Sequence, residues 1–272
     1  MKLQKLKRRM SGFTLVEMAL VMVIVGLLIG GILKGIEMRA NARVNVTIAQ
    51  VQGYIATAVT FRDRYNALPG DMSNAFARIP GCNATCDPGM AAEASNSIIG
   101  MQGWGGAGWP TQTAVPPAAA LLGAQAQGET VLFWTHLYHA GLLSGVTRAA
   151  LLGGSAAWNI THPEAKVGGG FVVGWGDGTP APGSPMATGD TGMALMLVQS
   201  PFSGTVAGLT APGVQPLTPG MAAVLDRKAD DGFADNGYVR AYGVAATCFG
   251  NAGSYLENAT SRDCGLIFSV AR

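Results

Sequence analysis

The hydrophobic pattern of the chain begins with one long apolar run near the N-terminus. Residues 13–33, FTLVEMALVMVIVGLLIGGIL, contain a single charged residue, Glu17. About twenty apolar residues at a rise of 1.5 Å per residue cross the roughly 30 Å hydrocarbon core of a bilayer. The run therefore predicts a membrane-spanning helix, which we bound at residues 13–35.

Residues 36–66 continue this helix with a different pattern. Apolar side chains recur every three or four positions, and the opposite face is polar. The apolar positions are Val44, Ile48, Val51, Ile55 and Val59. This spacing predicts an amphipathic second half that lies on a sheet by one stripe. The helix should measure roughly 80 Å from Phe13 to Tyr65. Pro69 and Gly70 should end it, because the residue before a proline avoids the helical region. We interpret Asp71, which follows, as a turn-forming or capping residue and not as a catalytic acid.

The remaining residues, 67–272, predict one globular domain. Residues 129–143 have the spacing of a short helix, and three runs rich in β-formers follow it, at 170–175, 194–199 and 238–244. Short connections between such runs favour an antiparallel sheet. The predicted fold class is α+β, with a long N-terminal helix packed on a C-terminal antiparallel sheet.

A long surface loop is predicted inside this domain. Residues 81–128 are rich in Gly, Ala and Pro and contain Trp104 and Trp109. Loops of this length in compact domains are usually functional or mobile. A loop that carries two aromatic residues could form a contact surface.

Composition and charge narrow the class of protein. Charged residues make up 12% of the chain, about half of the usual ~25%, so much of the surface could contact other protein. Five of the 18 Lys and Arg lie in the first nine residues, which leaves 13 against 16 Asp and Glu and a formal charge of −3 for the rest. A slightly acidic chain lacks the clustered basic face that nucleic acid requires, so we expect no nucleic-acid partner.

The basic residues sit directly before the apolar run. Residues 1–12, MKLQKLKRRMSG, hold five positive charges and no acid. Such a cluster holds the N-terminus in the cytoplasm and directs the globular part outward. A secretory signal peptide would have a shorter apolar core with a cleavage site after it. Here the processing signal precedes the apolar run.

This junction resembles the type IV prepilin signature of type IV pilins and type II secretion pseudopilins. The segment that resembles it is Ser11-Gly12-Phe13-Thr14-Leu15-Val16-Glu17. The resemblance implies that a prepilin peptidase removes residues 1–12 as a leader by cutting after Gly12, and that Phe13 becomes the N-methylated terminus. It also implies a pilin-like fold and assembly with other pilin subunits. The turn at residues 64–72 is similar to the segment after the long helix in many pilin-like proteins.

Glu17 is also notable on physical grounds, because a carboxylate inside a bilayer is costly and is normally retained with a partner or for a function. The resemblance implies that in a filament Glu17 pairs with the free α-amino group of Phe13 on a neighbouring subunit. A tolerated, protonated Glu is the alternative. Four glycines in the same run could let helices approach closely in lipid, or could reflect only the high glycine content of membrane helices. They are Gly26, Gly30, Gly31 and Gly35.

The four cysteines form two sequence-local pairs, Cys82 with Cys86 and Cys248 with Cys264. An even, clustered count in an exported chain predicts two disulfides. A zinc site is the alternative, although neither pair has the C-x2-C spacing of a zinc knuckle. Two of the three histidines, His136 and His139, stand three apart on the predicted helix, and we interpret them as packing or surface residues.

One acidic segment, residues 225–237, is predicted to be a loop and could bind a hard cation. Calcium prefers six to eight oxygen ligands, with glycine allowing a sharp turn. The candidate ligands are Asp226, Asp230, Asp231, Asp235 and Asn236. The segment lacks the order of an EF-hand, and an Asp/Gly turn without metal remains the alternative. No cofactor other than calcium is expected.

These observations favour a structural filament subunit located in the inner membrane, with an outward globular domain that then joins a pilus or pseudopilus. The alternative is a minor tip subunit that initiates assembly, or that acts as an adhesin or substrate-binding module, which the large mature chain and the Trp-bearing loop favour. Catalysis is not expected, because G-x-S-x-G, H-E-x-x-H and Walker A sequences are absent. The sequence is equally compatible with a type IV pilus and a type II secretion pseudopilus, and with a major and a minor subunit.

Overall fold

The structure is a computed structural model, and it describes residues 14–83, 86–87, 95, 97, 99, 129–146, 157–177, 191–201, 212–250 and 253–270. The chain divides into two compact units, Met1–Ala42 and Arg43–Arg272, and each is described by itself. The predicted leader, Phe13, Trp104, Trp109 and most of the predicted loop 81–128 lie outside the described residues.

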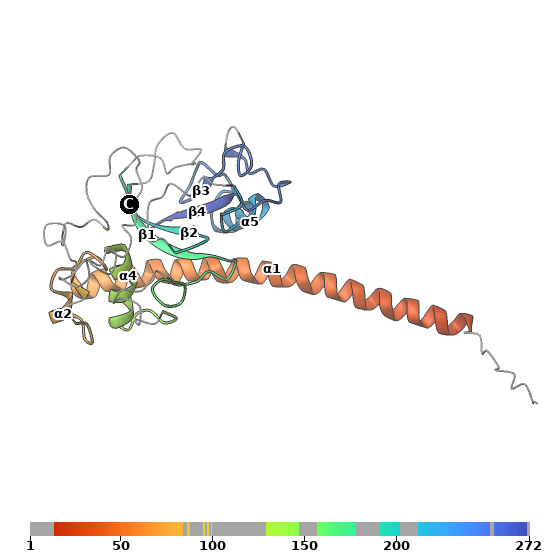
Figure 1. Cartoon of the computed structure of the whole chain (residues 1–272), viewed down its shortest axis with the longest axis horizontal. Helices are drawn as coiled ribbons and strands as arrows, with labels where there is room; N and C mark the ends of the chain where they lie inside the picture. Colours follow the sequence, from red (N-terminus) through yellow and green to blue (C-terminus); the bar gives the residue numbers. More distant parts are fainter. Residues whose placement is uncertain are drawn as a thin grey trace, which may run out of the picture. The chain divides into compact units, whose positions relative to one another are not determined.

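The elements follow the α+β order predicted from the sequence (Figure 1). In the part of the chain that the structure describes, a long helix comes first, two short helices and a pair of strands follow, and another short helix precedes the last two strands. Their bounds are α1 Leu15–Tyr65, α2 Ala75–Arg78, α4 Glu129–His139, β1 Gly170–Asp177, β2 Thr191–Val198, α5 Pro219–Ala229, β3 Val239–Gly243 and β4 Cys264–Ser269.

In the first unit, α1 presents apolar side chains on every side. Residues 14–34 are all exposed, and Leu15 has a relative exposure of 90%. Among the described residues, α1 is the one helix that is long and apolar enough to cross a membrane. A helix that is hydrophobic all round needs lipid or protein around it.

In the second unit, the outer part of α1 buries a stripe with steps of three and four residues. The buried positions are Val44, Thr47, Val51, Tyr54, Ala58, Phe61 and Tyr65. The predicted stripe was therefore partly wrong: Val44 and Val51 belong to it, but Val59 is 48% exposed. Aromatic packing determines which face of α1 is buried, since Tyr54 contacts Phe171 of β1 edge to face, with ring centroids 5.4 Å apart.

The strands form one antiparallel sheet in the order β1-β2-β4-β3. The three predicted strand runs correspond to β1, β2 and β3. The fourth strand, β4, lies between β2 and β3, so that Leu266 pairs with Leu197 on one side and with Ala241 on the other. The C-terminal segment is therefore a central strand of the sheet.

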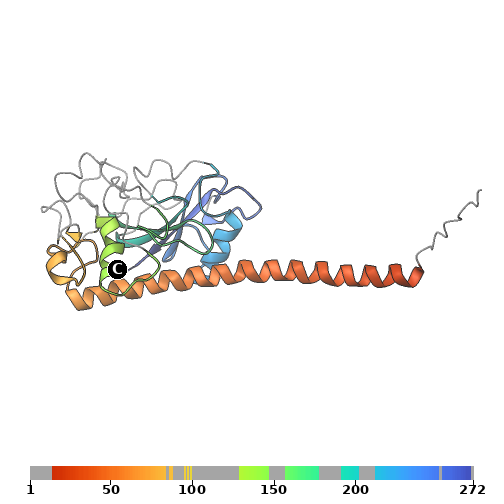
Figure 2. The ribbon, with the colours of Figure 1, turned by 60° about the horizontal axis from the view of Figure 1, so that its bottom comes forward.

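The two faces of the sheet alternate as strand geometry requires. One face joins the main core with α1, α4 and α5 and includes Phe171, Leu195, Leu266 and Phe268. The opposite face carries a second, smaller apolar cluster of Val172, Ala194, Met196, Val198, Tyr242 and Ile267. Figure 2 shows the strands between α4 and α5.

Helix α5 was not predicted from the sequence, although a helix-start signal is present at its first residues. The Thr218 side chain accepts a hydrogen bond from the Met221 backbone N–H at 3.4 Å, and Pro219 occupies the first turn. This is an N-terminal cap with proline at a favoured position. The segment 225–237, read as a loop from its sequence, therefore begins inside a helix, and Asp226 is a helical residue.

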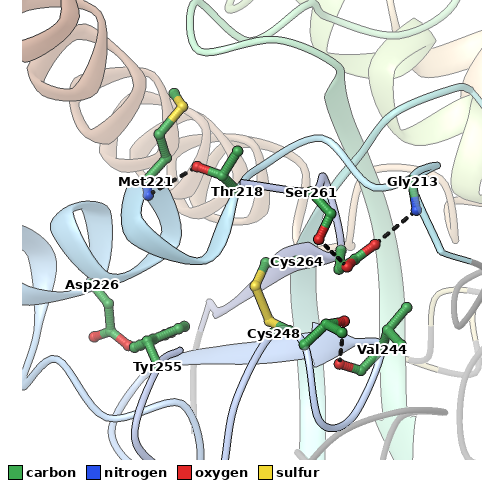
Figure 3. The surroundings of a disulfide bond; sticks show 11 residues. Gly213, Thr218, Met221, Asp226, Val244, Cys248, Tyr255, Ser261 and Cys264 are labelled. Atoms are coloured by element: carbon green, nitrogen blue, oxygen red, sulfur yellow. Dashed lines mark hydrogen bonds between the residues drawn. A yellow bond between two sulfur atoms is a disulfide. The ribbon is translucent and has the colours of Figure 1, made fainter. Parts of the chain in front are cut away.

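The Cys248–Cys264 disulfide lies next to this helix and at the start of β4 (Figure 3). Its Cα atoms are 5.2 Å apart, and both cysteines are fully buried. Leu217, which precedes the cap of α5, exchanges backbone hydrogen bonds with Cys264. The disulfide thus ties the first residue of β4 to the segment that follows β3.

Candidate functional site

The first candidate site is the N-terminal end of α1. The Thr14 backbone N–H and hydroxyl donate to Glu17 Oε2 at 2.9 and 2.8 Å, and the Glu17 N–H donates to the Thr14 hydroxyl at 3.2 Å. This reciprocal pair is a capping box, which satisfies donors that a helix end otherwise leaves without partners. Within the single chain, Glu17 therefore holds the start of its own helix.

The glycines of α1 leave room for a neighbour. A Cβ atom placed at Gly26, Gly30, Gly31 or Gly35 would meet no heavy atom within 4 Å. Small residues let a second helix approach closely where packing, and not water exclusion, drives association. The exposed apolar surface of residues 14–33 can accept lipid or another apolar helix.

The second candidate site contains the first pair of cysteines. Cys82 and Cys86 form a disulfide with Cα atoms 5.8 Å apart. Cys86 is buried and Cys82 is half-buried. Both sulfur atoms and a ring nitrogen of His139 lie within 4.8 Å of one another. His139 is the last residue of α4, so the helix brings an imidazole to the disulfide.

One turn earlier on α4, His136 is fully buried and connects two loops, at Gly70 and at Cys86, by hydrogen bonds. Its Nδ1 accepts from the Gly70 N–H at 2.9 Å, so Nε2 carries the proton and donates to the Cys86 carbonyl at 2.8 Å. Burial lowers the pKa of His136 to about 4, which keeps the ring neutral. The interpretation of His136 as a packing residue fits this place, but the sequence did not reveal which segments it joins.

The third candidate site is the acidic cluster at the end of α5. One carboxylate oxygen each from Asp226, Asp230 and Asp231 lie within 4.8 Å of one another. Asp226 accepts from the Tyr255 hydroxyl at 2.7 Å (Figure 3) and from the Gly232 N–H at 3.0 Å. Burial raises the pKa of Asp226 to about 6, and the charges of Asp231 and Asp230 add to this rise.

Three of the five predicted cation ligands, all of them carboxylates, therefore come together, and Asp235 is not in this group. Asp235 lies against Gly253, where an added Cβ would collide with its carboxylate. The Asn236 backbone N–H donates to the Phe233 carbonyl at 3.4 Å. Three carboxylates are fewer than the six to eight oxygens that calcium prefers, so carbonyls or water would have to complete the shell.

Two features of these sites went unrecognised in the sequence. Thr14-Leu15-Val16-Glu17 has the S/T-x-x-E spacing of a capping box, which could have been found. The approach of His139 to Cys82 and Cys86 could not, because 53 residues of sequence separate His139 from Cys86 and no local pattern reports that contact.

Comparison with known families identifies the N-terminal segment. Residues 7–33 match the family described as the prokaryotic N-terminal methylation motif. The matched residues include the end of the basic segment, Gly12 and the whole apolar run from Phe13 to Leu33, with Glu17. Neither the curated proteins nor the solved structures give a match to the chain.

Proposed function

Because the chain carries the N-terminal signal of type IV pilins and pseudopilins, we propose that it is a structural subunit of a type IV pilus or of a type II secretion pseudopilus. The observation that carries this proposal is that the methylation motif, residues 7–33, overlaps the first part of α1, where residues 14–34 are all exposed. The helix serves first as a membrane anchor and then as the core of a filament. The proposed role is assembly and includes no catalytic step.

Prepilin peptidase is the proposed processing partner. It cuts between Gly12 and Phe13, removes the five positive charges of the leader, and leaves Phe13 as an N-methylated terminus. The cut also places a new α-amino group four residues before Glu17. Two charges of opposite sign are thereby available at nearly the same depth of the membrane, where an isolated charge is costly.

The globular unit is proposed to face the periplasm. The basic leader favours a cytoplasmic N-terminus, and the two disulfides suit an oxidising compartment. A minor tip subunit is the second candidate, favoured by a mature chain of 260 residues. Counting subunits in sheared filaments separates the two roles, since a tip subunit is present in a few copies per filament and a bulk subunit along its whole length.

The processing step provides the test of this proposal. Co-expression with a prepilin peptidase should shorten the chain by the twelve residues of the leader and methylate Phe13, as intact-mass spectrometry would show. Gly12→Ala should prevent most of the cleavage, whereas Gly26→Ala, a glycine in the same apolar run, should be processed normally. Filament protein that still begins at Met1 would overturn the proposal.

We propose separately that the acidic cluster of α5 binds calcium. The three carboxylates repel one another, and a divalent cation would relieve that repulsion. Calcium should raise the melting temperature of the chain by mass action. Asp231→Asn should lose this effect, because Asp231 belongs to the cluster, whereas Asp235→Asn should keep it. No calcium-dependent shift in the unmodified chain would exclude the site.

A further inference from the structure

We propose that the Cys82–Cys86 disulfide and His139 form a zinc site that is available only when the disulfide is open. Two cysteine sulfurs and an imidazole nitrogen are ligands that zinc prefers, and three protein ligands with one position left for water is a common arrangement. Their atoms already lie within 4.8 Å of one another. The proposal does not rest on the filament role of the chain.

The loop that carries the cysteines is held by contacts other than the disulfide. His136 donates to the Cys86 carbonyl at 2.8 Å, the Cys82 N–H donates to the Ile79 carbonyl at 3.2 Å, and the Cys86 N–H donates to the Asn83 carbonyl at 2.8 Å. These hydrogen bonds do not involve sulfur. Opening the disulfide therefore leaves both thiols near the positions they occupy now, which lowers the cost of ordering them around a metal.

His139 is positioned by the backbone beside the cysteines. A Cβ atom at Gly81 would come within 3.3 Å of His139 Nδ1, so the imidazole lies directly against the residue before Cys82. Gly81 has φ +81°, a conformation that favours glycine. The turn at Gly81 and the end of α4 thus bring the ring and the two sulfurs together.

The chemistry of the site balances in two steps. A dithiol reductant attacks the half-exposed sulfur of Cys82, the Cys82–Cys86 bond breaks, and the reductant leaves as its own disulfide with both cysteines as thiols. One Zn²⁺ then replaces the two thiol protons, which pass to solvent, and binds the neutral imidazole of His139. The newly made chain also passes through the dithiol state before its disulfide forms. Zinc and the disulfide are therefore alternative closures of the same loop.

Selective opening of this disulfide makes the site testable in the full chain. Cys248 and Cys264 are fully buried, so limited reduction with a phosphine should open Cys82–Cys86 first, as thiol labelling and peptide mapping would verify. Titration against a chromogenic zinc chelator should then find one zinc ion per opened chain and none on the oxidised chain. Zinc should also slow re-formation of the disulfide in air.

Variants of His139 test whether its imidazole binds the zinc ion or only packs against the loop. His139→Phe keeps an aromatic ring and should bind zinc at least tenfold more weakly, whereas His139→Cys restores a ligand and should recover the affinity. Circular dichroism checks that each variant is folded. Two results would overturn the proposal: an opened chain that binds no zinc, and a folded His139→Phe variant that binds zinc as tightly as the unmodified chain.

Discussion

Asp226 shows how one buried carboxylate makes stability depend on pH. Its oxygens accept from Tyr255 and Gly232, yet burial raises its pKa from 3.8 to about 6. The groups that face it are Tyr255, Asp230, Asp231, Arg227 and Tyr238. Between pH 4 and pH 6 the folded chain holds a proton that the unfolded chain has already lost. The contribution of Asp226 to stability is therefore complete below about pH 4 and falls as the pH rises through 6.

Asp226→Asn tests this relation in a fragment that begins at Arg43. The amide can still accept from Gly232 and donate to the Tyr255 oxygen, so we expect similar stability at pH 4. A pKa shift of this size corresponds to at most about 3 kcal/mol of folding free energy. Solvent screening near the exposed Asp231 side chain makes the actual contribution smaller. The variant should gain about 1–2 kcal/mol over the unmodified fragment at pH 8. Urea unfolding at both pH values measures the difference, and an equal difference at pH 4 and 8 would contradict the relation.

At the scale of the elements, the second half of α1 gives the clearest comparison of prediction and structure. The sequence placed Val51 and Val59 on one stripe. In the structure the relative exposure of Val51 is 2% and that of Val59 is 48%. The two valines share one helix and one side-chain type, so they form a matched pair.

Val51→Ala should therefore destabilise the same fragment by about 2 kcal/mol, because it removes buried methyl groups and leaves a cavity. Val59→Ala should change stability by less than about 0.5 kcal/mol, as substitutions at exposed positions usually do. Denaturant midpoints measure both effects. Equal losses would mean that the predicted stripe, and not the observed one, faces the sheet.

The sequence predicted the elements better than their contacts. The membrane helix, α4, β1, β2 and β3 follow from periodicity and composition, because each pattern is local. The buried face of α1 did not, since Thr47 and Ala58 are not strongly apolar and Tyr54 is buried through contacts with Trp134 and Phe171. The central place of β4 depends on pairing with strands far away in the chain, which no local pattern contains.

The candidate sites show the same limit. The processing signal and the cysteine pairs are contiguous or close in sequence, so they could be read directly. The acidic cluster was predicted as five ligands on a loop, but a helix that begins at the Thr218 cap runs through Asp226, and the carboxylates of Asp226, Asp230 and Asp231 lie together at its end. The end of α4 brings His139 to the Cys82–Cys86 bond, a contact between distant segments.

At the scale of the whole molecule, the two units differ in what they leave exposed. The second unit buries most of its described apolar residues in a core that includes both disulfides. The first unit exposes them, and its apolar run holds one acid, Glu17. In the described residues the longest stretch of exposed apolar side chains is therefore the first part of α1, which is the surface that the proposed exchange of lipid for neighbouring helices requires.

Glu17→Ala should affect membrane insertion of the helix and its assembly into filaments in different ways. Removal of a carboxylate from the apolar run makes membrane insertion easier, so the variant should reach the membrane at least as well as the unmodified chain. Its incorporation into filaments should fall at least tenfold if, as we propose, Glu17 pairs with the α-amino group of Phe13 on a neighbouring subunit. Immunoblots of membrane and sheared-filament fractions measure both quantities.

Two control variants distinguish this pairing from other roles of an acid on α1. Thr14→Ala breaks the capping box, which costs about 0.5–2 kcal/mol at the helix end, but it keeps the carboxylate and should still assemble. Glu37→Ala removes an exposed acid that pairs with Lys34 at 2.8 Å outside the apolar run, and it should assemble normally. If Thr14→Ala reduced assembly as strongly as Glu17→Ala, the capping box and not the pairing with Phe13 would account for the loss. Normal assembly of Glu17→Ala would show that the carboxylate does not align the subunits.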